Sequence, residues 1–272
     1  MTDRPGEPTE LAELALDIAR EAGSFLLPGA GAVEALATKS SPHDLVTAMD
    51  RDSEDLVRRR IQEARPDDQV VGEEQGTRGA ASSVRWIVDP LDGTVNYFYG
   101  QPSWAVSIGV EIDGFMAAGA VVAPALGEEY LGIAGSGSWT IEQGVRRPLR
   151  VSEIPDLADA VVSTGFGYVR ARREQQAGIV AALLPQVRDI RRVGAAAVDL
   201  CWVARGRIDA HYERGLQDWD RAAGSAIAAE AGAVVAGLRG TPASADLLIA
   251  ANPQLYRQLD TALAQLRADS GD

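Results

Sequence analysis

The spacing of apolar residues changes along this chain from helical to extended, and that change restricts the folds available to it. Residues 9–26 place apolar side chains at helical intervals, and a second helix is predicted from about Leu45 to Ala64, just before Pro66. Beyond Pro66 the apolar residues form short runs separated by turn residues, which is typical of paired strands. We expect these strands at 70–71, 84–88, 106–112, 116–122, 130–133 and 138–141.

From about residue 155 onward, strands and helices alternate. The expected strands lie at 160–163, near 190, and at 208–212, 234–235 and 247–250, and the expected helices at 171–184, 195–204, 221–231 and 253–266. Elements of this kind bury their apolar faces by stacking in layers. The sequence therefore predicts an N-terminal α+β half (1–153) and a C-terminal α/β half (154–272), with helices layered against two sheets in one compact unit.

The residue types exclude several kinds of site. One cysteine and two histidines among 272 residues exclude a disulfide framework and a zinc site built from several such ligands. Cys201 lies in an apolar helical run, which favours a buried core thiol over a nucleophile. A chain of this length also buries enough surface to fold without a structural metal. The chemistry of the protein is therefore expected to come from oxygen atoms.

The charge of the chain narrows the classes of partner. It carries 39 acidic and 26 basic residues, for a formal net charge of −13. This excess argues against nonspecific binding to nucleic acid or to an anionic membrane, and a phosphorylated substrate would need added cations. Lys39 is the only lysine and follows Thr38, which excludes a P-loop. The polar first residues, and apolar runs that are all short or interrupted, predict neither a signal peptide nor a membrane span.

The most informative stretch is WIVDPLDGTVN, residues 86–96. A buried strand leads into Asp89, the following proline keeps Asp89 extended, and a turn brings Asp92 back towards it. Gly93 permits close approach of the backbone, and Thr94 resembles the start of a helix, whose N–H groups favour an anion. Two carboxylates beside an anion site outline a metal-dependent phosphate-transfer site, although the same residues also suit an ordinary turn.

Two further segments place acids at the ends of predicted elements. Glu73 and Glu74 follow a short valine strand, where adjacent like charges need a cation or solvent. Asp220 precedes an alanine-rich helix, where an N-cap and a metal ligand are compatible roles. Glu73, Asp89, Asp92 and Asp220 make a hard, all-oxygen ligand set suited to Mg²⁺ or Mn²⁺. A structural calcium site would use the same acids, but the sequence has no EF-hand spacing.

Four motifs together resemble the signature of the inositol monophosphatase family. They are WIVDPLDGTVN, KSSPHDLVTAMD at 39–50, GEE at 72–74, and WDRAAG with EAG between 219 and 232. They follow the family's order, and the match covers roughly residues 36–252. The resemblance implies a layered αβαβα sandwich of the sugar phosphatase type and, usually, a cytoplasmic homodimer.

The resemblance also implies two to three Mg²⁺ ions per subunit, for which Mn²⁺ would be a substitute. Glu73, Asp89 and the Leu91 carbonyl would hold one ion, and Asp89, Asp92 and Asp220 would hold a second. A third, weaker ion is expected near Glu73. Inhibition by Li⁺ is expected through displacement of the more weakly held ion.

The same resemblance assigns catalytic roles. Thr94, oriented by Asp50, would act with Glu73 to help activate the water that attacks phosphorus directly, without a covalent nucleophile. The amides of Gly93 and Thr94 would bind phosphate oxygens. Three residues would support the site without contacting the metal: Lys39, Asp44 and Glu74.

The alcohol portion of the substrate would contact a further set of positions. These are Asp92, Gly194, Ala195, Ala196, Glu213 and Asp220. Ala195 stands where many members of the family have threonine, and His211 where many have tyrosine. The first change removes a hydroxyl near the substrate and weakens the case for strict selectivity towards inositol.

The implied activity is Mg²⁺-dependent hydrolysis of myo-inositol 1-phosphate and related polyol or sugar monophosphates. The alternatives on the same fold are phosphatases for histidinol phosphate, fructose 1,6-bisphosphate or 3′-phosphoadenosine phosphates. The last two usually need an extra basic patch, and the clusters that stand out are Arg170–Arg173 and Arg188–Arg192. A member that mainly binds the transcription machinery would be free to lose the catalytic positions, whereas this chain has all of them. The expected partners are a small phosphate monoester and, as the resemblance implies, a second copy of the chain, with no direct nucleic acid and no membrane.

Overall fold

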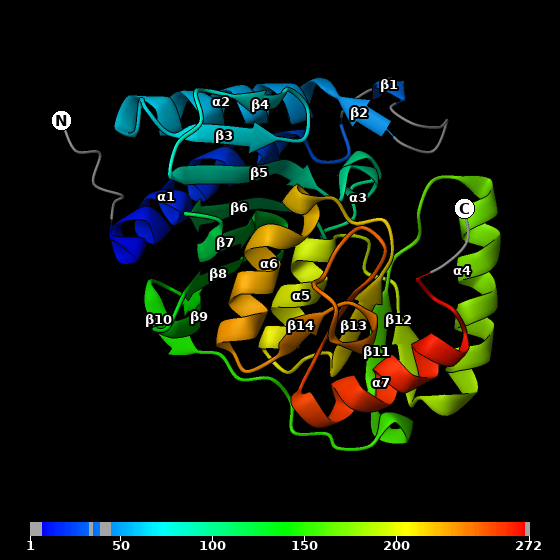
Figure 1. Cartoon of the computed structure of the whole chain (residues 1–272). Coiled ribbons are helices and arrows are strands. Elements are labelled where there is room, and N and C mark those ends of the chain that lie inside the picture. The colour runs from blue at the N-terminus through cyan, green and yellow to red at the C-terminus, as the bar shows by residue number, and fades with distance from the viewer. Residues whose placement is uncertain (1–6, 33–34, 39–44, 270–272) are drawn as a thin grey trace.

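The computed structural model describes residues 7–32, 35–38 and 45–269, and it describes the side chains of 7–32 and 48–269. Within these ranges, two sheets and three groups of helices stack in the order α/β/α/β/α (Figure 1). This order confirms the αβαβα sandwich predicted from the sequence. Lys39 and Asp44 lie outside the described residues.

The larger sheet has eight strands in the order β10-β9-β8-β7-β6-β5-β3-β4. Neighbours pair antiparallel except β3 and β5, which are parallel. The bounds are β3 Gln69–Gly72, β4 Gly76–Arg78, β5 Val84–Asp92, β6 Ala105–Ile112, β7 Phe115–Ala123, β8 Glu128–Ile133, β9 Gly137–Glu142 and β10 Val145–Pro148.

The smaller sheet has five strands in the order β12-β11-β13-β15-β14. Strand β11 pairs parallel with β12 and β13, whereas β15 pairs antiparallel with β13 and β14. The bounds are β11 Val161–Thr164, β12 Asp189–Arg191, β13 Ala210–Glu213, β14 Val234–Ala236 and β15 Leu248–Ala251. A separate two-stranded pair is formed by β1 (Ala35–Thr38) and β2 (Leu45–Thr47).

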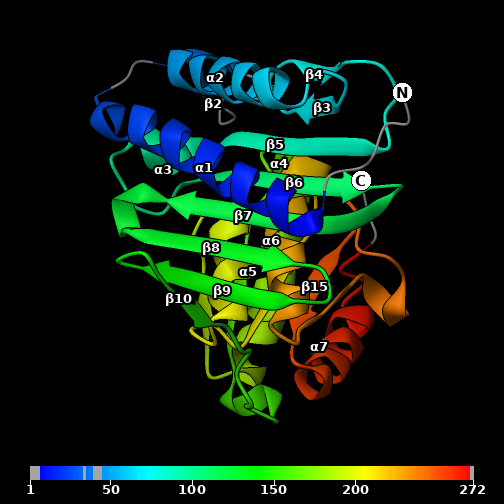
Figure 2. The same ribbon diagram turned by 90° about the vertical axis from the view of Figure 1, so that its left-hand side faces the viewer.

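The helices cover both faces of each sheet. Their bounds are α1 Pro8–Leu26, α2 Ala48–Ala64, α3 Thr94–Phe98, α4 Arg170–Leu183, α5 Ala196–Ala204, α6 Asp218–Glu230 and α7 Pro253–Gln265. Helices α1 and α2 lie on one face of the larger sheet (Figure 2). Helix α6 packs on β6, β7 and β8 from the other side, and α5 contacts both α6 and the smaller sheet. Helices α4 and α7 pack into the core of the smaller sheet.

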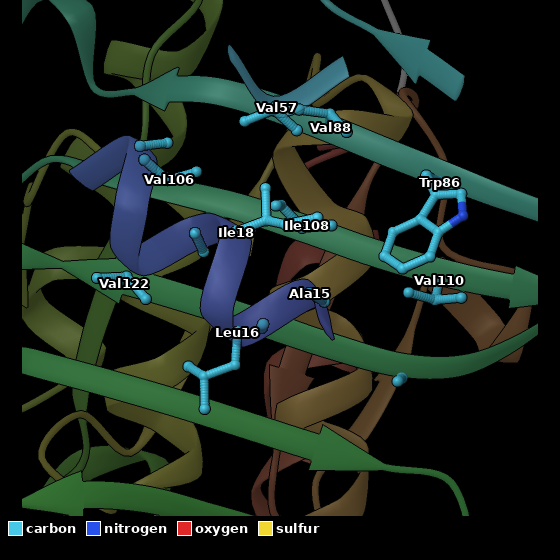
Figure 3. Close-up of a cluster of buried hydrophobic side chains, with 14 of the residues drawn as sticks. Ala15, Leu16, Ile18, Val57, Trp86, Val88, Val106, Ile108, Val110 and Val122 are labelled. Atoms are coloured by element: carbon cyan, nitrogen blue, oxygen red, sulfur yellow. The ribbon is translucent and has the colours of Figure 1, made fainter. Parts of the chain in front are cut away.

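The predicted apolar stripe of the first helix forms part of the main core. Leu16 and Ile18 of α1 lie in one buried cluster with Trp86 and Val88 of β5 and Ile108 of β6, and all five are at most 1% exposed (Figure 3). Burying an apolar side chain of this size stabilises the fold by about 1.5–3 kcal/mol. This core fixes β5, the strand that ends in the WIVDPLD motif.

A row of three glycines brings α6 unusually close to the larger sheet. Gly109, Gly119 and Gly132 are paired directly across β6, β7 and β8. A Cβ atom on Gly119 would lie 2.5 Å from the Ala223 carbonyl oxygen, so any side chain there would push the helix away. This close packing holds the first turn of α6, which carries Asp220, near the carboxyl end of β5.

Three predicted element boundaries were wrong. The second helix starts at Ala48, because residues 45–47 pair with β1 and backbone pairing overrides a weak helical preference. Strand β5 continues through Pro90 to Asp92, with an irregular register between Asp89 and Asp92 in place of a free turn. Helix α6 starts at Asp218, before the predicted start at 221, because Gln217 caps it.

Four described strands were not predicted: β1 and β2, which pair with each other, and β4 and β10. Every residue of β4 and β10 is exposed, so neither strand has the apolar alternation on which the sequence analysis depends. Both pair along the edge of the sheet through backbone hydrogen bonds.

The division of the chain into two halves between residues 153 and 154 stays a prediction. In the described ranges, no helix is long and apolar enough to cross a membrane.

Candidate functional site

A pocket of about 400 Å³ opens where the carboxyl end of β5 meets the starts of α3, α5 and α6. Most of the residues predicted for the site line it. They are Glu73, Asp89, Leu91, Asp92, Gly93, Thr94, Gly194, Ala195, Ala196, Glu213 and Asp220. Of the other predicted residues that the structure describes, Asp50 lies behind Thr94, and Glu74 follows Glu73 outside the lining.

Asp89 and Asp92 are held at the irregular end of β5. Both are nearly buried, at 2% and 8% exposure. The Leu91 N–H donates to Asp89 Oδ1 at 3.0 Å, and the Ala197 N–H donates to Asp92 Oδ2 at 2.7 Å. The Ser53 hydroxyl donates to the Pro90 carbonyl at 2.9 Å. These bonds fix the two carboxylates and anchor the β5 terminus to α2 and α5.

The electrostatics of the pocket favour a cation. Burial raises the pKa of Asp89 well above its usual range, and the negative charges of Glu73, Asp92 and Asp220 raise it further. Burial also raises the pKa of Asp92, with Asp220 as its strongest charged neighbour. In the described part of the chain, no three acidic, histidine or cysteine side chains are closed around one point as they stand. Because these carboxylates raise one another's pKa values, a cation between them would relieve their repulsion, and their oxygen atoms are donors of the kind that Mg²⁺ prefers.

Thr94 and Asp50 form the predicted pair. The Thr94 hydroxyl lies 2.9 Å from Asp50 Oδ1, to which it donates, and 3.2 Å from the Leu91 carbonyl oxygen. Asp50 is fully buried on α2, whereas Thr94 lines the pocket as the first residue of α3. With its proton directed at Asp50, the Thr94 oxygen keeps its lone pairs free to accept a hydrogen bond from the pocket.

The backbone conformation at residue 93 explains why the DGT sequence has glycine just before α3. Its φ angle is +88°, in the left-handed region that favours glycine. A Cβ atom there would also lie 2.9 Å from the Ser103 carbonyl oxygen. The backbone can therefore turn sharply from Asp92 into Thr94 only with glycine at this position.

The loop that carries Glu73 depends on two residues that the sequence analysis missed. Glu54 is fully buried on α2 and accepts hydrogen bonds from the Glu74 N–H at 2.7 Å and the Gln75 N–H at 3.1 Å. Arg58 donates to Glu54 at 2.7 Å and also contacts the Gly76 carbonyl. Their spacing of four residues on a predicted helix was the available signal, but an exposed ion pair has the same spacing.

We expect Glu54→Gln to weaken this loop. The new amide places an N–H₂ group where the carboxylate accepted hydrogen bonds and leaves buried Arg58 without its counter-charge, at a cost of about 3 kcal/mol in unfolding free energy. At temperatures where the variant stays folded, activity should need more Mg²⁺, because Glu73 is held less firmly. Urea denaturation and a Mg²⁺ titration measure the two effects. Glu63→Gln, an exposed change on the same helix, is the control, and equal Mg²⁺ requirements in both variants would contradict the prediction.

Asp220 lies in the first turn of α6 and is not its N-cap, which corrects the sequence analysis. Gln217 is the N-cap, and Asp220 is the third helical residue. The Asp220 Oδ2 atom accepts a hydrogen bond from the Gln217 N–H at 2.7 Å, which completes a capping box. Asp220 also lines the pocket, so the capping and ligand roles are both open to it.

We expect Asp220→Asn to separate these roles. The asparagine oxygen can still accept the Gln217 N–H, so the unfolding free energy should stay within about 0.5 kcal/mol of the parent value. The lost negative charge should weaken the binding of Mg²⁺ if Asp220 is a ligand. Thermal denaturation and a Mg²⁺ titration measure these effects. An unchanged Mg²⁺ affinity would leave Asp220 with capping alone.

Glu213, the last residue of β13, lines the same pocket, and His211 and Ser163 lie next to it. The Ser163 hydroxyl lies 2.9 Å from His211 Nδ1, and His211 Nε2 lies 3.6 Å from Glu213 Oε2. Burial lowers the pKa of His211 to about 3, so the imidazole is neutral near pH 7. Burial raises the pKa of Glu213, and Asp199, which the sequence analysis missed, raises it further.

Cys201 is fully buried, and burial raises the pKa of its thiol, which agrees with a core thiol.

Known proteins resemble this chain over nearly its whole length. A model of the inositol monophosphatase family matches residues 7–271. Inositol-1-monophosphatase SuhB of Mycobacterium tuberculosis is 43% identical over 284 residues, which cover 97% of this chain and 96% of that protein. A solved structure of Mycobacterium tuberculosis SuhB has a TM-score of 0.84 at 40% identity, covering 98% and 100%. The Nus factor SuhB of Pasteurella multocida is 34% identical over 254 residues, covering 92% and 94%.

Proposed function

Because the chain belongs to the inositol monophosphatase family, we propose that it is a Mg²⁺-dependent phosphomonoesterase that hydrolyses myo-inositol 1-phosphate and related polyol or sugar monophosphates. The single observation that carries the proposal is the group of mutually repelling carboxylates around one pocket, Glu73, Asp89, Asp92 and Asp220. Such a pocket repels a phosphate dianion unless cations reverse its charge.

We assign Glu73, Asp89 and the Leu91 carbonyl to one Mg²⁺ and Asp89, Asp92 and Asp220 to a second, with a weaker third ion near Glu73. When bound, Mg²⁺ supplies positive charge that lowers the pKa of water and stabilises the leaving alkoxide. Mn²⁺ is the expected substitute, and Li⁺ the expected inhibitor. The pocket residues present the right donor atoms for this assignment, and no cysteine or histidine competes among the lining residues.

The chain's own residues orient the reaction. Asp50 accepts a hydrogen bond from the Thr94 hydroxyl, and as the attacking water gives a proton to the Thr94 oxygen on the pocket side, the Thr94 hydroxyl proton passes to Asp50. The amides of Gly93 and Thr94 bind the phosphate oxygens. Glu213 accepts hydrogen bonds from substrate hydroxyls, while Gly194, Ala195 and Ala196 shape the wall beside it. The water oxygen attacks phosphorus directly as the bond from phosphorus to the alcohol oxygen breaks, and the leaving alkoxide takes a proton from a solvent water molecule.

The second candidate role is binding to the transcription machinery. Relatives at 34% and 36% identity bear the names Nus factor SuhB and putative Nus factor SuhB, which makes this role specific enough to test. The two roles do not exclude each other, because a protein-binding surface need not involve the pocket. A homodimer in the cytoplasm is the expected state for either role.

The decisive experiment measures phosphate release from a panel of sugar, polyol and nucleotide phosphates, with Mg²⁺ and with excess EDTA. We expect turnover of myo-inositol 1-phosphate with Mg²⁺ and none with EDTA. Full turnover in EDTA would overturn the metal dependence. No release from any monoester with Mg²⁺ would overturn the phosphatase assignment and leave the transcription role as the leading candidate.

A further inference from the structure

Three arginines line the same pocket as the carboxylates. Arg172 comes from α4, Arg192 follows β12, and Arg214 follows β13, so three separate segments each bring one guanidinium group to this wall. We call these residues the arginine wall. The proposed hydrolysis of a phosphate ester of an uncharged polyol uses none of them.

The backbone around the arginine wall leaves room for its side chains. A Cβ atom on Gly215 would lie 2.8 Å from Arg172 Nη1, and one on Gly194 would lie 2.1 Å from Arg192 Nη1. Arg214 is only 8% exposed, and its Nη1 donates to Gln175 Oε1 at 2.9 Å. These guanidinium groups therefore lie against the walls of the pocket.

Arg192 of the arginine wall acts on Glu213, whereas no arginine is among the main influences on Asp89 and Asp92. Burial and the neighbouring acids are the main influences that raise the pKa of Asp89 and Asp92. Burial, Asp199 and Asp220 raise the pKa of Glu213, and Arg192 opposes them. The three arginines line the pocket together with Glu213, and Arg192 is close enough to Glu213 to act against the rise in its pKa.

We propose that the arginine wall binds a second anionic group of the substrate, so that the preferred substrates are phosphate monoesters whose alcohol portion carries another phosphate or a carboxylate. The inference rests on the proposed phosphatase function and adds to it a substrate class that is preferred over monoesters of uncharged polyols. A guanidinium group suits this role because its paired N–H donors match both phosphate and carboxylate oxygens. The reacting phosphate would then lie with Mg²⁺ beside the carboxylates of Asp89, Asp92 and Asp220, and the second anion would lie at the arginine wall.

The competing explanation is that the arginines only balance Glu213 and Asp199. Matched substrates separate the two explanations. 2-Phosphoglycerate and glycerol 2-phosphate differ only by a carboxylate in place of a hydroxymethyl group. α-Glucose 1,6-bisphosphate and α-glucose 1-phosphate differ only by the second phosphate. A wall that only balances charge would not favour the second anion in either pair.

The test measures kcat and KM for both pairs at saturating Mg²⁺. We expect kcat/KM to be about tenfold or more higher for the doubly anionic member of at least one pair, mainly through KM, since one charge-assisted hydrogen bond is worth roughly that factor. The pair that shows the preference identifies the second anion as phosphate, carboxylate or both. Arg172→Gln and Arg214→Gln should each move the ratio towards one. Arg173→Gln, an exposed change on the same helix, should leave it unchanged.

Because Arg214 is nearly buried, its variant can fail to fold, and half-buried Arg172 keeps the test decisive. Ratios near one in the parent protein for both pairs would overturn the inference and leave the phosphatase function intact. A preference that survives in Arg172→Gln and in folded Arg214→Gln would overturn it as well. No hydrolysis of any of the four esters with Mg²⁺ would overturn the proposed function and this inference together.

Discussion

Replacing Asp89 with asparagine should nearly abolish phosphate release and, at the same time, stabilise the metal-free protein. Asp89 is 2% exposed and lies among other acids, so its negative charge is unfavourable without a cation. Asparagine has the same shape and keeps an oxygen to accept the Leu91 N–H. The unfolding free energy measured in EDTA should therefore rise by about 1 kcal/mol or more.

The same change should remove the effect of Mg²⁺. A ligand that binds only the folded protein stabilises it in proportion to the logarithm of its concentration over its dissociation constant. The parent protein should therefore gain thermal stability with Mg²⁺, whereas Asp89→Asn should gain little. Its activity should fall roughly 10³-fold, since metal ions contribute several kcal/mol of transition-state stabilisation.

The opposite directions of the two effects make this prediction specific. A variant that loses activity because it folds poorly would lose stability as well. Asp113→Asn, an exposed change in the β6–β7 turn, is the control and should match the parent in activity and in the response to Mg²⁺. Equal stabilisation of the parent and Asp89→Asn by Mg²⁺ would show that Asp89 does not bind the metal.

Four of the residues that line the pocket were predictable because they lie in one continuous motif. Asp89, Asp92, Gly93 and Thr94 fall within six residues, and each has a local physical reason to be what it is. The strand, the irregular β5 end and the positive φ angle of Gly93 all follow from neighbouring residues. Sequence reasoning reaches such a site because backbone geometry alone brings its parts together.

The residues that support the pocket were not predictable, because they come from segments that are far apart in the sequence. Glu54 on α2 contacts the Glu73 loop about twenty residues away, and Arg172 and Arg214 reach the pocket from separate elements. Nothing in a helical charge pattern distinguishes a buried Glu54–Arg58 pair from an exposed one. Likewise, the arginine run at 170–173 indicated a basic cluster, but only tertiary packing selects Arg172 from that run as a residue of the pocket.

The ends of the helices and strands were also predicted less accurately than their positions in the sequence. Asp220 was expected to cap its helix, but the capping box gives that position to Gln217. The error has a functional consequence. A side chain in the first helical turn projects from a fixed backbone, so Asp220 is held with defined geometry at the pocket.

The largest purely catalytic effect is expected at Thr94 and Asp50. Thr94→Ala and Asp50→Asn should each lower kcat by about 10² to 10⁴, the usual contribution of general acid–base assistance. KM and the Mg²⁺ requirement should change little, because neither side chain is assigned to the metal or to the alcohol portion of the substrate. Thr261→Ala and Asp52→Asn, both exposed, are matched controls and should retain parent activity.

The double variant tests whether the two residues act as one unit. Asp50 is fully buried and reaches the pocket through the 2.9 Å hydrogen bond from Thr94, so removing either residue already breaks the path. The double variant should then be no slower than the slower single variant, with a coupling free energy close to the whole effect of one substitution. Measured kcat values for the parent, both single variants and the double variant give this coupling directly. Rate losses that multiply would mean that Asp50 and Thr94 contribute separately, and the buried carboxylate would then act on the reaction by some route other than the threonine hydroxyl.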